Sequence, residues 1–254
     1  VTDQGFSDGC KHRKDLHAVY NQYTATTNDP IYTSASEDLQ LLFRPLFTTA
    51  FLIDDFLDDN AYFVADQVII SSASAKTAVG TACLLSARKS CQVIGLTSQA
   101  NKDFVTGLGC YDQVVIYEDI ETLDSGAGTA FVDIAGNGSV RARIHHHFKG
   151  NLKYSCTVGA SHWNQGADTG DLPGAKPTLF FAPAQGQKRN QDGGPAVLQE
   201  RFMAAWIDFT GFIADRISID HDIGSEAIET LYQAMLAGNV APDHAHIAGF
   251  DIES

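Results

Sequence analysis

Residues 66–86, DQVIISSASAKTAVGTACLLS, constrain the fold of this chain more than any other stretch. The run Val68-Ile69-Ile70 is short and β-branched, as a buried parallel strand is, and a turn of small residues leads directly into an Ala- and Leu-rich helical segment. At such a junction the N–H groups of the first helical turn are unpaired and the helix dipole lies behind them, so a pyrophosphate can bind there. The stretch therefore predicts the opening of a nucleotide-binding βαβ unit.

The turn of this unit, residues 71–77, lacks the first two glycines of a G-x-G-x-x-G fingerprint. Gly80 stands where a helix glycine would let the helix lie close on the strand. Serine and alanine still permit a close approach, and three serine hydroxyls with the Lys76 ammonium add donors that glycine cannot supply. Two interpretations stay open: a phosphate cradle, or an ordinary strand-turn-helix without a ligand.

The next apolar run, residues 91–96, predicts a second buried strand, and the residues that follow it bear on the choice of nucleotide. An acidic side chain at this point would accept the adenosine ribose hydroxyls of NAD, and none is present. Thr97 and Ser98 supply hydroxyls and Lys102 supplies a positive charge, which together suit the extra 2′-phosphate of NADP. Lys102 as ordinary surface charge is the alternative.

Further strand and helix patterns alternate along the chain and predict an α/β fold with a doubly wound parallel sheet. Strands are expected at residues 114–117, 129–133, 152–158 and 179–182, with helices at 101–108 and 139–148. The loop after the 152–158 strand holds His162 and Trp163, and in such a sheet it faces the same crevice as the turn at 71–77. His162 is a candidate proton donor; a packed loop with a satisfied histidine is the competing interpretation.

The two ends of the chain have a different character. Residues 1–40 are polar and irregular, with one or two strands expected in 16–24, and residues 46–57 predict a helix with Leu46, Ala50, Ile53 and Leu57 on one face. Residues 185–194 are polar, residues 195–216 and 225–236 predict amphipathic helices, and short strands are expected at 217–219 and around Ile247. Four acids, Asp54, Asp55, Asp58 and Asp59, are interpreted as a solvated face rather than a metal cluster, and His145, His146 and His147 as an exposed helix end.

Composition excludes several classes of function. The 254 residues carry 17 basic and 31 acidic side chains, a net charge of -14 that repels nucleic acid and anionic lipid. No apolar segment approaches the roughly 18 residues that a membrane helix needs, so no membrane partner is expected. Five cysteines without a C-x-x-C pair favour free thiols in a reducing compartment, which places the protein in the cytoplasm.

Several motifs, spread over nearly the whole chain, resemble the medium-chain dehydrogenase/reductase superfamily, and more closely its branch known as domain of unknown function 2855. The resemblance depends on RPLFTT at 44–49, FLIDDF at 51–56, SSASAKTA at 71–78, GLTS at 95–98, LGCYD at 108–112, VDIAGN at 132–137, VGASHW at 158–163 and FFAP at 180–183.

The resemblance implies a Rossmann domain joined to a GroES-like substrate domain, and transfer of a hydride between NADP(H) and a carbonyl or activated alkene of a small-molecule substrate. It implies residues 1–42 as the remainder of the GroES-like domain, 43–190 as the Rossmann domain, and 191–254 as helices and strands returning to the substrate domain. It also implies a homodimer formed through the sheet edge at residues 179–182. The residues implied to bind the cofactor are Ser72, Ala73, Ser74, Lys76 and Thr77 at the pyrophosphate, Thr97, Ser98 and Lys102 at the adenosine, and Ala135, Gly159 and Ala160 near the nicotinamide.

Two departures from the superfamily pattern shape the remaining expectations. The chain has no Cys/His zinc-ligand pattern, so it is similar to the zinc-free quinone and enoyl reductases, and the expected oxyanion donors are Tyr20, Tyr23, Asn21 and His162. The resemblance also implies that Val1 lies inside the substrate domain, so the first half of that domain is expected to be missing from this sequence.

Two other classes of function compete with a reductase. A non-catalytic nucleotide-binding or oligomerising module would keep the Rossmann half alone. A P-loop ATPase is weakly copied by Lys76 and Thr77 after a strand, with Asp133 ending a later one, but the glycines that form its anion nest are missing.

Overall fold

The computed structural model of the chain describes residues 2, 5–16, 18–158 and 172–250. They form two compact units, Val1–Leu41 and Leu42–Ser254. The unit boundary lies within one residue of the predicted end of the first segment, and the three-part domain division remains a prediction.

The first unit is built from two short strands and single 3-10 turns. Strands β1 (Gly5–Ser7) and β2 (Gln22–Thr24) pair antiparallel, and the 3-10 turns are η1 (Lys11–Arg13), η2 (Ala18–Tyr20), η3 (Thr26–Asn28) and η4 (Ser34–Ser36). The strand expected in residues 16–24 is therefore correct only at its end. Asn21 fixes the turn before β2, because its side chain accepts from Arg13 Nε and donates to the Arg13 carbonyl, each at 3.0 Å.

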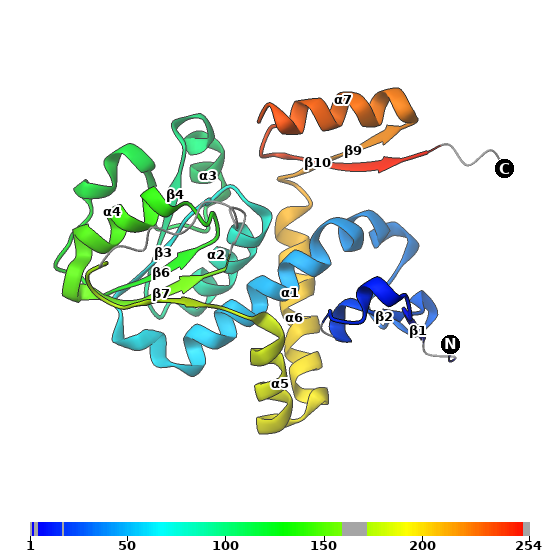
Figure 1. Cartoon of the computed structure of the whole chain (residues 1–254), viewed down its shortest axis with the longest axis horizontal. Helices are drawn as coiled ribbons and strands as arrows, with labels where there is room; N and C mark the ends of the chain where they lie inside the picture. Colours follow the sequence, from blue (N-terminus) through cyan, green and yellow to red (C-terminus); the bar gives the residue numbers. More distant parts are fainter. Residues whose placement is uncertain (1, 3–4, 17, 159–171, 251–254) are drawn as a thin grey trace. The chain divides into compact units, whose positions relative to one another are not determined.

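The second unit is organised around a six-stranded parallel sheet, which confirms the predicted fold class. Its strands are β3 (Gln67–Ile70), β4 (Gln92–Thr97), β5 (Gln113–Ile116), β6 (Thr129–Asp133), β7 (Leu152–Thr157) and β8 (Pro177–Leu179), in the spatial order β5-β4-β3-β6-β7-β8. Figure 1 labels β3, β6 and β7 next to one another in this sheet. The order reverses between β3 and β6, and in a doubly wound sheet the crevice for ligands opens at that point.

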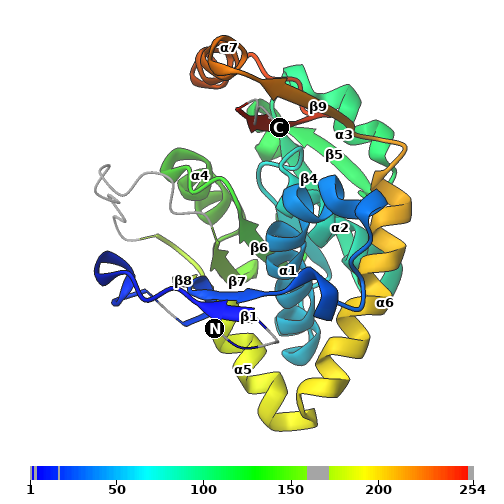
Figure 2. The same cartoon turned by 90° about the vertical axis from the view of Figure 1, so that its right-hand side faces the viewer.

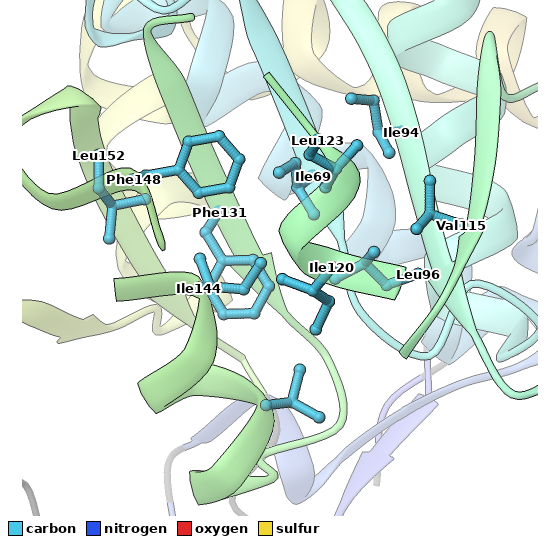
Figure 3. Packing of buried hydrophobic residues seen from close by; sticks show 11 residues of the cluster. Ile69, Ile94, Leu96, Val115, Ile120, Leu123, Phe131, Ile144, Phe148 and Leu152 are labelled. Carbon is cyan, nitrogen blue, oxygen red and sulfur yellow. The ribbon is translucent and has the colours of Figure 1, made fainter. Parts of the chain in front are cut away.

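One face of the sheet is covered by α4 (Gly138–Phe148) and the 3-10 segment η7 (Tyr117–Thr122). Their apolar side chains meet those of the sheet in one buried cluster, shown in Figure 3. Its members alternate along the strands, as side chains on one face of a sheet do. They are Ile69, Ile94, Leu96, Val115, Ile120, Leu123, Phe131, Val140, Ile144, Phe148 and Leu152.

The remaining helices of the Rossmann part are α1 (Glu37–Asp59), α2 (Lys76–Arg88), α3 (Lys102–Leu108) and α6 (Pro195–Ile213). Helices α1 and α6 pack together through aromatic rings, with Phe47 stacked on Phe209 at a centroid distance of 4.5 Å. A Cβ on Gly80 would come within 3.0 Å of Ala50 Cβ and 3.2 Å of Phe47. The expectation that Gly80 lies against a strand is therefore wrong, since this glycine lets α2 approach α1.

The acidic residues of α1 form ion pairs, so their interpretation as a solvated face is wrong for the two that are buried. Asp54 accepts hydrogen bonds from Nε and Nη2 of Arg88. Asp55 is 0% exposed and lies 3.0 Å from Arg189 Nε and 2.8 Å from Arg201 Nη1. Leu46, expected on the buried face, is 37% exposed, whereas Ala50, Ile53 and Leu57 are buried as predicted.

Arg189 belongs to α5 (Ala182–Gly193), a helix that the polar residues 185–194 did not indicate. The sixth strand also ends earlier than expected, at Leu179, because Pro183 in the first turn of α5 starts a helix instead.

A second, separate βαβ element ends the chain. Strand β9 (Ser218–Ile223), helix α7 (Ser225–Leu236) and strand β10 (His244–Gly249) form it, with β9 and β10 paired in parallel. Figures 1 and 2 both show α7 lying along this strand pair. The predicted helix at 225–236 is confirmed, and the strand expected around Ile247 is β10.

Candidate functional site

The turn between β3 and α2 lies at the carboxyl edge of the sheet, and Gly95 lets it approach the neighbouring strand. A Cβ on Gly95 would come within 2.9 Å of both Ala73 Cβ and the Tyr111 ring. The turn is held in this position by two hydrogen bonds at Ala73, whose N–H donates to the Leu96 carbonyl at 2.9 Å and whose carbonyl accepts from Tyr111 Oη at 2.8 Å. Ala73 is thus a buried anchor of the turn.

The amino end of α2 presents free donors beside this turn. Ala75 caps the helix without a side-chain hydrogen bond, and its own N–H donates to the Ser72 carbonyl at 2.7 Å. No described residue accepts a hydrogen bond from the N–H of Lys76, Thr77 or Ala78. Together with the helix dipole, these N–H groups favour an anion at this position.

Ser72 occupies the backbone conformation for which nucleotide-binding turns use glycine. Its φ of 50° lies in the left-handed region, which L-residues rarely adopt. Its N–H donates to Tyr117 Oη at 2.9 Å, so a tyrosine at the end of β5 supports the strained residue. Strain of this kind concentrates at ligand-binding sites.

Asp133, at the end of β6, joins the two strands that flank the crevice. This fully buried carboxylate accepts from Ser71 Oγ at 2.9 Å, from the Gly136 N–H at 3.0 Å and from Arg141 Nε at 3.0 Å. Ser71 Oγ in turn accepts from the Ala135 N–H at 3.1 Å. The hydroxyl of Ser71 is therefore a structural link and is not directed to a ligand, contrary to the expectation that all three serine hydroxyls serve as donors.

This buried network was not anticipated from the sequence, although a signal for it exists. Asp133 directly follows a run of buried strand residues, and an acid there must find partners because an isolated buried charge is costly. Arg141, eight residues later on α4, and the Gly136 turn supply them.

The residues expected at the adenosine end lie together after β4, but they differ in exposure. The Thr97 side chain is buried at 1% exposed, whereas Ser98 and Lys102 are half-buried. Asn101, between them, donates from Nδ2 to Ser74 Oγ at 3.0 Å, so this loop is tied to the turn. Ser98 and Lys102 remain the accessible candidates for a phosphate on the ribose.

Lys76 connects the turn to the C-terminal βαβ element. Its Nζ donates to the His244 carbonyl at 3.0 Å, and burial lowers the pKa of this lysine. Position 244 opens β10, so the start of that strand lies beside the amino end of α2.

Two histidine–aspartate pairs cross the β9–β10 pair next to this contact. His244 Nδ1 lies 2.6 Å from Asp220 Oδ2, and His246 Nδ1 lies 2.9 Å from Asp222 Oδ2. The hydrogen bond with Asp220 raises the pKa of His244. No local sequence pattern indicates these four residues, because the members of each pair are 24 residues apart and only the pairing of β9 with β10 brings them together.

The histidine run of α4 is not an exposed helix end, so that expectation is wrong for His145. This residue is fully buried, with Nδ1 3.0 Å from the Pro173 carbonyl and Nε2 2.9 Å from Ser155 Oγ. A carbonyl only accepts, so Nδ1 carries the proton and Nε2 accepts from the serine hydroxyl. Burial lowers the pKa of His145, and the ring is neutral.

The residues expected to stabilise an oxyanion lie in the first unit or outside the described residues. Tyr20 and Tyr23 belong to the first unit, where both are exposed and Tyr23 stacks on Phe6 at 4.6 Å. Asn21 is occupied by Arg13. Gly159, Ala160 and His162 lie outside the described residues. The roles of these residues stay predictions.

Other features of the described residues bear on metals, thiols and membranes. No cluster of three or more His, Cys, Asp or Glu side chains in the described ranges could hold a metal ion. All five cysteines are free thiols. Within the same ranges, none of the helices combines the length and the apolar character that crossing a membrane requires.

A cavity of about 600 Å³ opens at the far end of α2, between α2 and α6, with Cys83, Phe209 and Phe212 in its lining. Its wall is mostly apolar, and its lining includes no residue of the turn at 71–77. It is therefore separate from the candidate site.

Three solved structures illustrate the proteins that share this fold. They are CurA from Vibrio vulnificus in complex with NADPH (TM-score 0.57, 14% identity, 86% of this chain and 66% of that chain), the CurK enoyl reductase (TM-score 0.52, 12% identity, 92% and 67%) and the yhdH oxidoreductase from Salmonella enterica in complex with NADP (TM-score 0.50, 13% identity, 80% and 60%). The chain covers less than two-thirds of the length of CurA and of yhdH. At these identities the likeness establishes the fold.

Among curated proteins, none matches this sequence closely enough to count as a relative. One family model, described as "Protein of unknown function (DUF2855)", matches residues 1–241. The chain therefore belongs to the DUF2855 family and carries the fold of the medium-chain reductases, as the motifs at 71–78 and 132–137 predict.

Proposed function

We propose that this protein is an NADPH-preferring, zinc-independent reductase that transfers a hydride to a carbonyl or activated alkene. One observation carries the proposal: the turn at 71–75 and the free N–H groups of Lys76, Thr77 and Ala78 lie at the β3–β6 switch point of the sheet. Counted along the chain from β3, the strand order is 3-2-1-4-5-6, as in dinucleotide-binding sheets. A dinucleotide lies across that point in this fold class, with its pyrophosphate on the helix end.

The residues around the switch point fit a dinucleotide. The missing side chain of Gly95 lets the turn lie close to β4. The hydrogen bonds of Ser71 Oγ with Asp133 and with the Ala135 N–H join the ends of β3 and β6. In the proposal, residues 72–77 hold the pyrophosphate, Thr97, Ser98 and Lys102 face the adenosine end, and Ala135 with Gly159 and Ala160 lies near the nicotinamide. The bound dinucleotide supplies the hydride, and the chain positions it and stabilises the developing oxyanion.

Two observations support NADP over NAD. No acidic side chain stands at the end of β4 or in residues 98–102, and the half-buried Ser98 and Lys102 offer a hydroxyl and a positive charge to a 2′-phosphate. Two structures of the same fold, CurA and yhdH, were solved with NADPH or NADP.

The proton donor and the assembly belong to the proposal as well. Tyr20, Tyr23 and His162 are the donors proposed from the resemblance. A homodimer through the β8 edge is supported by its position at the end of the sheet and by Leu179, which is 65% exposed. A cytoplasmic location is supported by the five free thiols.

Fluorescence titration of the full chain with NADPH and NADH tests the proposal. NADPH should quench tryptophan emission at lower concentration than NADH, and Lys102→Ala should weaken NADPH binding by about tenfold while leaving NADH unchanged, since one phosphate contact is worth about 1–1.5 kcal/mol. Lys176→Ala, an exposed lysine at the start of β8, is the matched control. Binding of neither nucleotide would remove the proposal.

A nucleotide-binding module without catalysis is the second candidate. It would use the same turn at 71–75 and the same free N–H groups of Lys76, Thr77 and Ala78. NADPH oxidation assayed with a library of small carbonyls and enones separates the two, because steady turnover excludes the module.

A further inference from the structure

One face of the β9–β10 pair carries four ionisable side chains in a compact row. Side chains alternate between the faces of a strand, so Asp220 and Asp222 on β9 and His244 and His246 on β10 share one face. Ala245 points to the opposite face and is buried. The polar row is partly open, with side-chain exposures of 41% for His244 and 20% for His246.

The row consists of two parallel dyads of the same geometry. In each dyad an aspartate holds Nδ1 of the histidine, at 2.6 Å for His244 and 2.9 Å for His246. Within the described residues, neither Nε2 has a hydrogen-bond partner. A carboxylate on Nδ1 fixes the tautomer and the ring orientation, which leaves Nε2 as the atom that exchanges a proton with a ligand.

The contact of Lys76 with the His244 carbonyl places this row at the candidate site. Lys76 is the first residue of α2, where the nucleotide phosphates bind in the proposed function, and its Nζ reaches the main chain of the first dyad at 3.0 Å. The start of β10 therefore lies beside the helix end that holds the phosphates in the proposed function.

The charges around His244 favour a proton donor over a phosphate site. Asp220 and Asp222 on β9, Asp243 before β10 and His246 beside it all face or adjoin this ring, and Lys76 approaches only its carbonyl. With neutral imidazoles the row is negative, and with both protonated it is neutral, so it offers no net attraction to a dianion. Asp220 raises the pKa of His244, which increases its protonated fraction near neutral pH.

We propose that His244, oriented by Asp220, donates the proton in the reduction, and that the His246–Asp222 dyad beside it resupplies that proton. The inference rests on the proposed function. In the step, the Nε2–H bond of the His244 imidazolium breaks and an O–H bond forms on the oxyanion that the hydride has produced. His244 then regains a proton from solvent, directly or through His246, whose ring centroid lies 6.3 Å away.

NMR of histidine-labelled protein tests the placement without any turnover. Addition of NADP⁺ should shift the imidazole nitrogens of His244, assigned with His244→Gln, whereas adenosine 2′,5′-bisphosphate, which lacks the nicotinamide half, should not. If NADP⁺ quenches tryptophan emission but leaves His244 unmoved, the dyad proposal falls and the proposed function stands. An equal shift from the adenosine compound also overturns the dyad, and no NADP⁺ binding at all overturns both.

Kinetics with NADPH and a cyclic enone test the role. His244→Gln should lower kcat by about 100-fold with an unchanged Kd for NADPH, the range of general acid catalysis. In Asp220→Asn, loss of the partner that raises the His244 pKa should move the falling limb of the pH–kcat profile to lower pH. His221→Gln, on the other face of β9, is the matched control and should keep wild-type kcat. An unchanged kcat and pH profile in His244→Gln would refute the proposal.

Discussion

Gly95 shows how a single residue decides whether the turn can sit at the mouth of the sheet. Its missing Cβ leaves room for Ala73 on one side and for the Tyr111 ring on the other. Both neighbours are themselves fixed, because Tyr111 Oη donates to the Ala73 carbonyl and Ala73 is fully buried. The space cannot be recovered by a side-chain rotation.

Gly95→Ala should therefore displace the turn. We expect about tenfold weaker NADPH binding and a lower Tm, because a buried methyl group without space costs about 1–3 kcal/mol. Fluorescence titration and thermal unfolding measure the two effects. Gly107→Ala is the control, since an added Cβ on that α3 glycine meets no atom within 4 Å. It should leave NADPH binding unchanged and should not lower Tm, because alanine is favoured over glycine in a helix. Wild-type affinity in Gly95→Ala would contradict the close approach.

At the scale of elements, His145 connects α4 to β7 and to the segment before β8. Its ring joins the Pro173 carbonyl to the Ser155 hydroxyl, and burial lowers its pKa below the ordinary value of 6.5. The unfolded chain therefore binds a proton at this residue between pH 6.5 and the lowered pKa, where the folded chain does not. Stability from this group is complete above pH 6.5 and is lost as the pH falls through that window.

Wild-type Tm should accordingly fall between pH 7 and pH 5, and part of that fall should be absent in His145→Gln, although this variant starts from a lower Tm. Thermal unfolding at several pH values measures the slope. His146→Gln, one residue further on an exposed position, should keep the wild-type slope. Identical slopes in all three proteins would show that His145 does not titrate in this range.

The ion pairs of Asp55 hold α5 and α6 on α1. The carboxylate is fully buried between Arg189 and Arg201 and accepts from Gln185 Nε2 at 2.8 Å. Asp55→Asn takes the carboxylate away from Arg201 and leaves Arg189 with Asp59 and Asp192 only, and we expect a loss of about 3 kcal/mol in the free energy of unfolding. This corresponds to a fall of about 6–12 °C in Tm. Asp192→Asn, which removes exposed partners of Lys188 and Arg189, should cost under about 1 kcal/mol. Equal effects would contradict the difference in burial.

At the scale of the whole molecule, the six-stranded sheet ends in an open edge. Among the described residues, β8 pairs with one strand only, β7. Leu179 on β8 is 65% exposed. If two copies pair through this edge, Leu179→Lys should convert the dimer to a monomer, because charge on an edge strand opposes pairing. Light scattering after size-exclusion chromatography measures the mass. Lys153→Ala, on the neighbouring β7, is the control. A wild-type monomer would exclude this assembly.

The sequence by itself determined the sheet and its nucleotide-type crossover. Short β-branched runs separated by helical patterns admit few arrangements, because each buried strand needs helices on both faces and crossovers are right-handed. Residues 129–133 and 225–236 agree with the observed strand and helix at both ends. The turn at 71–75 was also located correctly, since small residues between a strand and a helix are a local signal.

Only the tertiary structure decided which polar groups are buried and which meet. Asp55 and His145 have the sequence context of surface residues, yet both are enclosed by partners from segments distant in the chain. Gly80 faces a helix and not a strand for the same reason. The dyad of Asp220 and His244 forms because β9 and β10 pair in a register that no local pattern encodes. Local propensity is written along the chain, but the partner of a charge or a small residue depends on packing between elements, which is a property of the folded molecule.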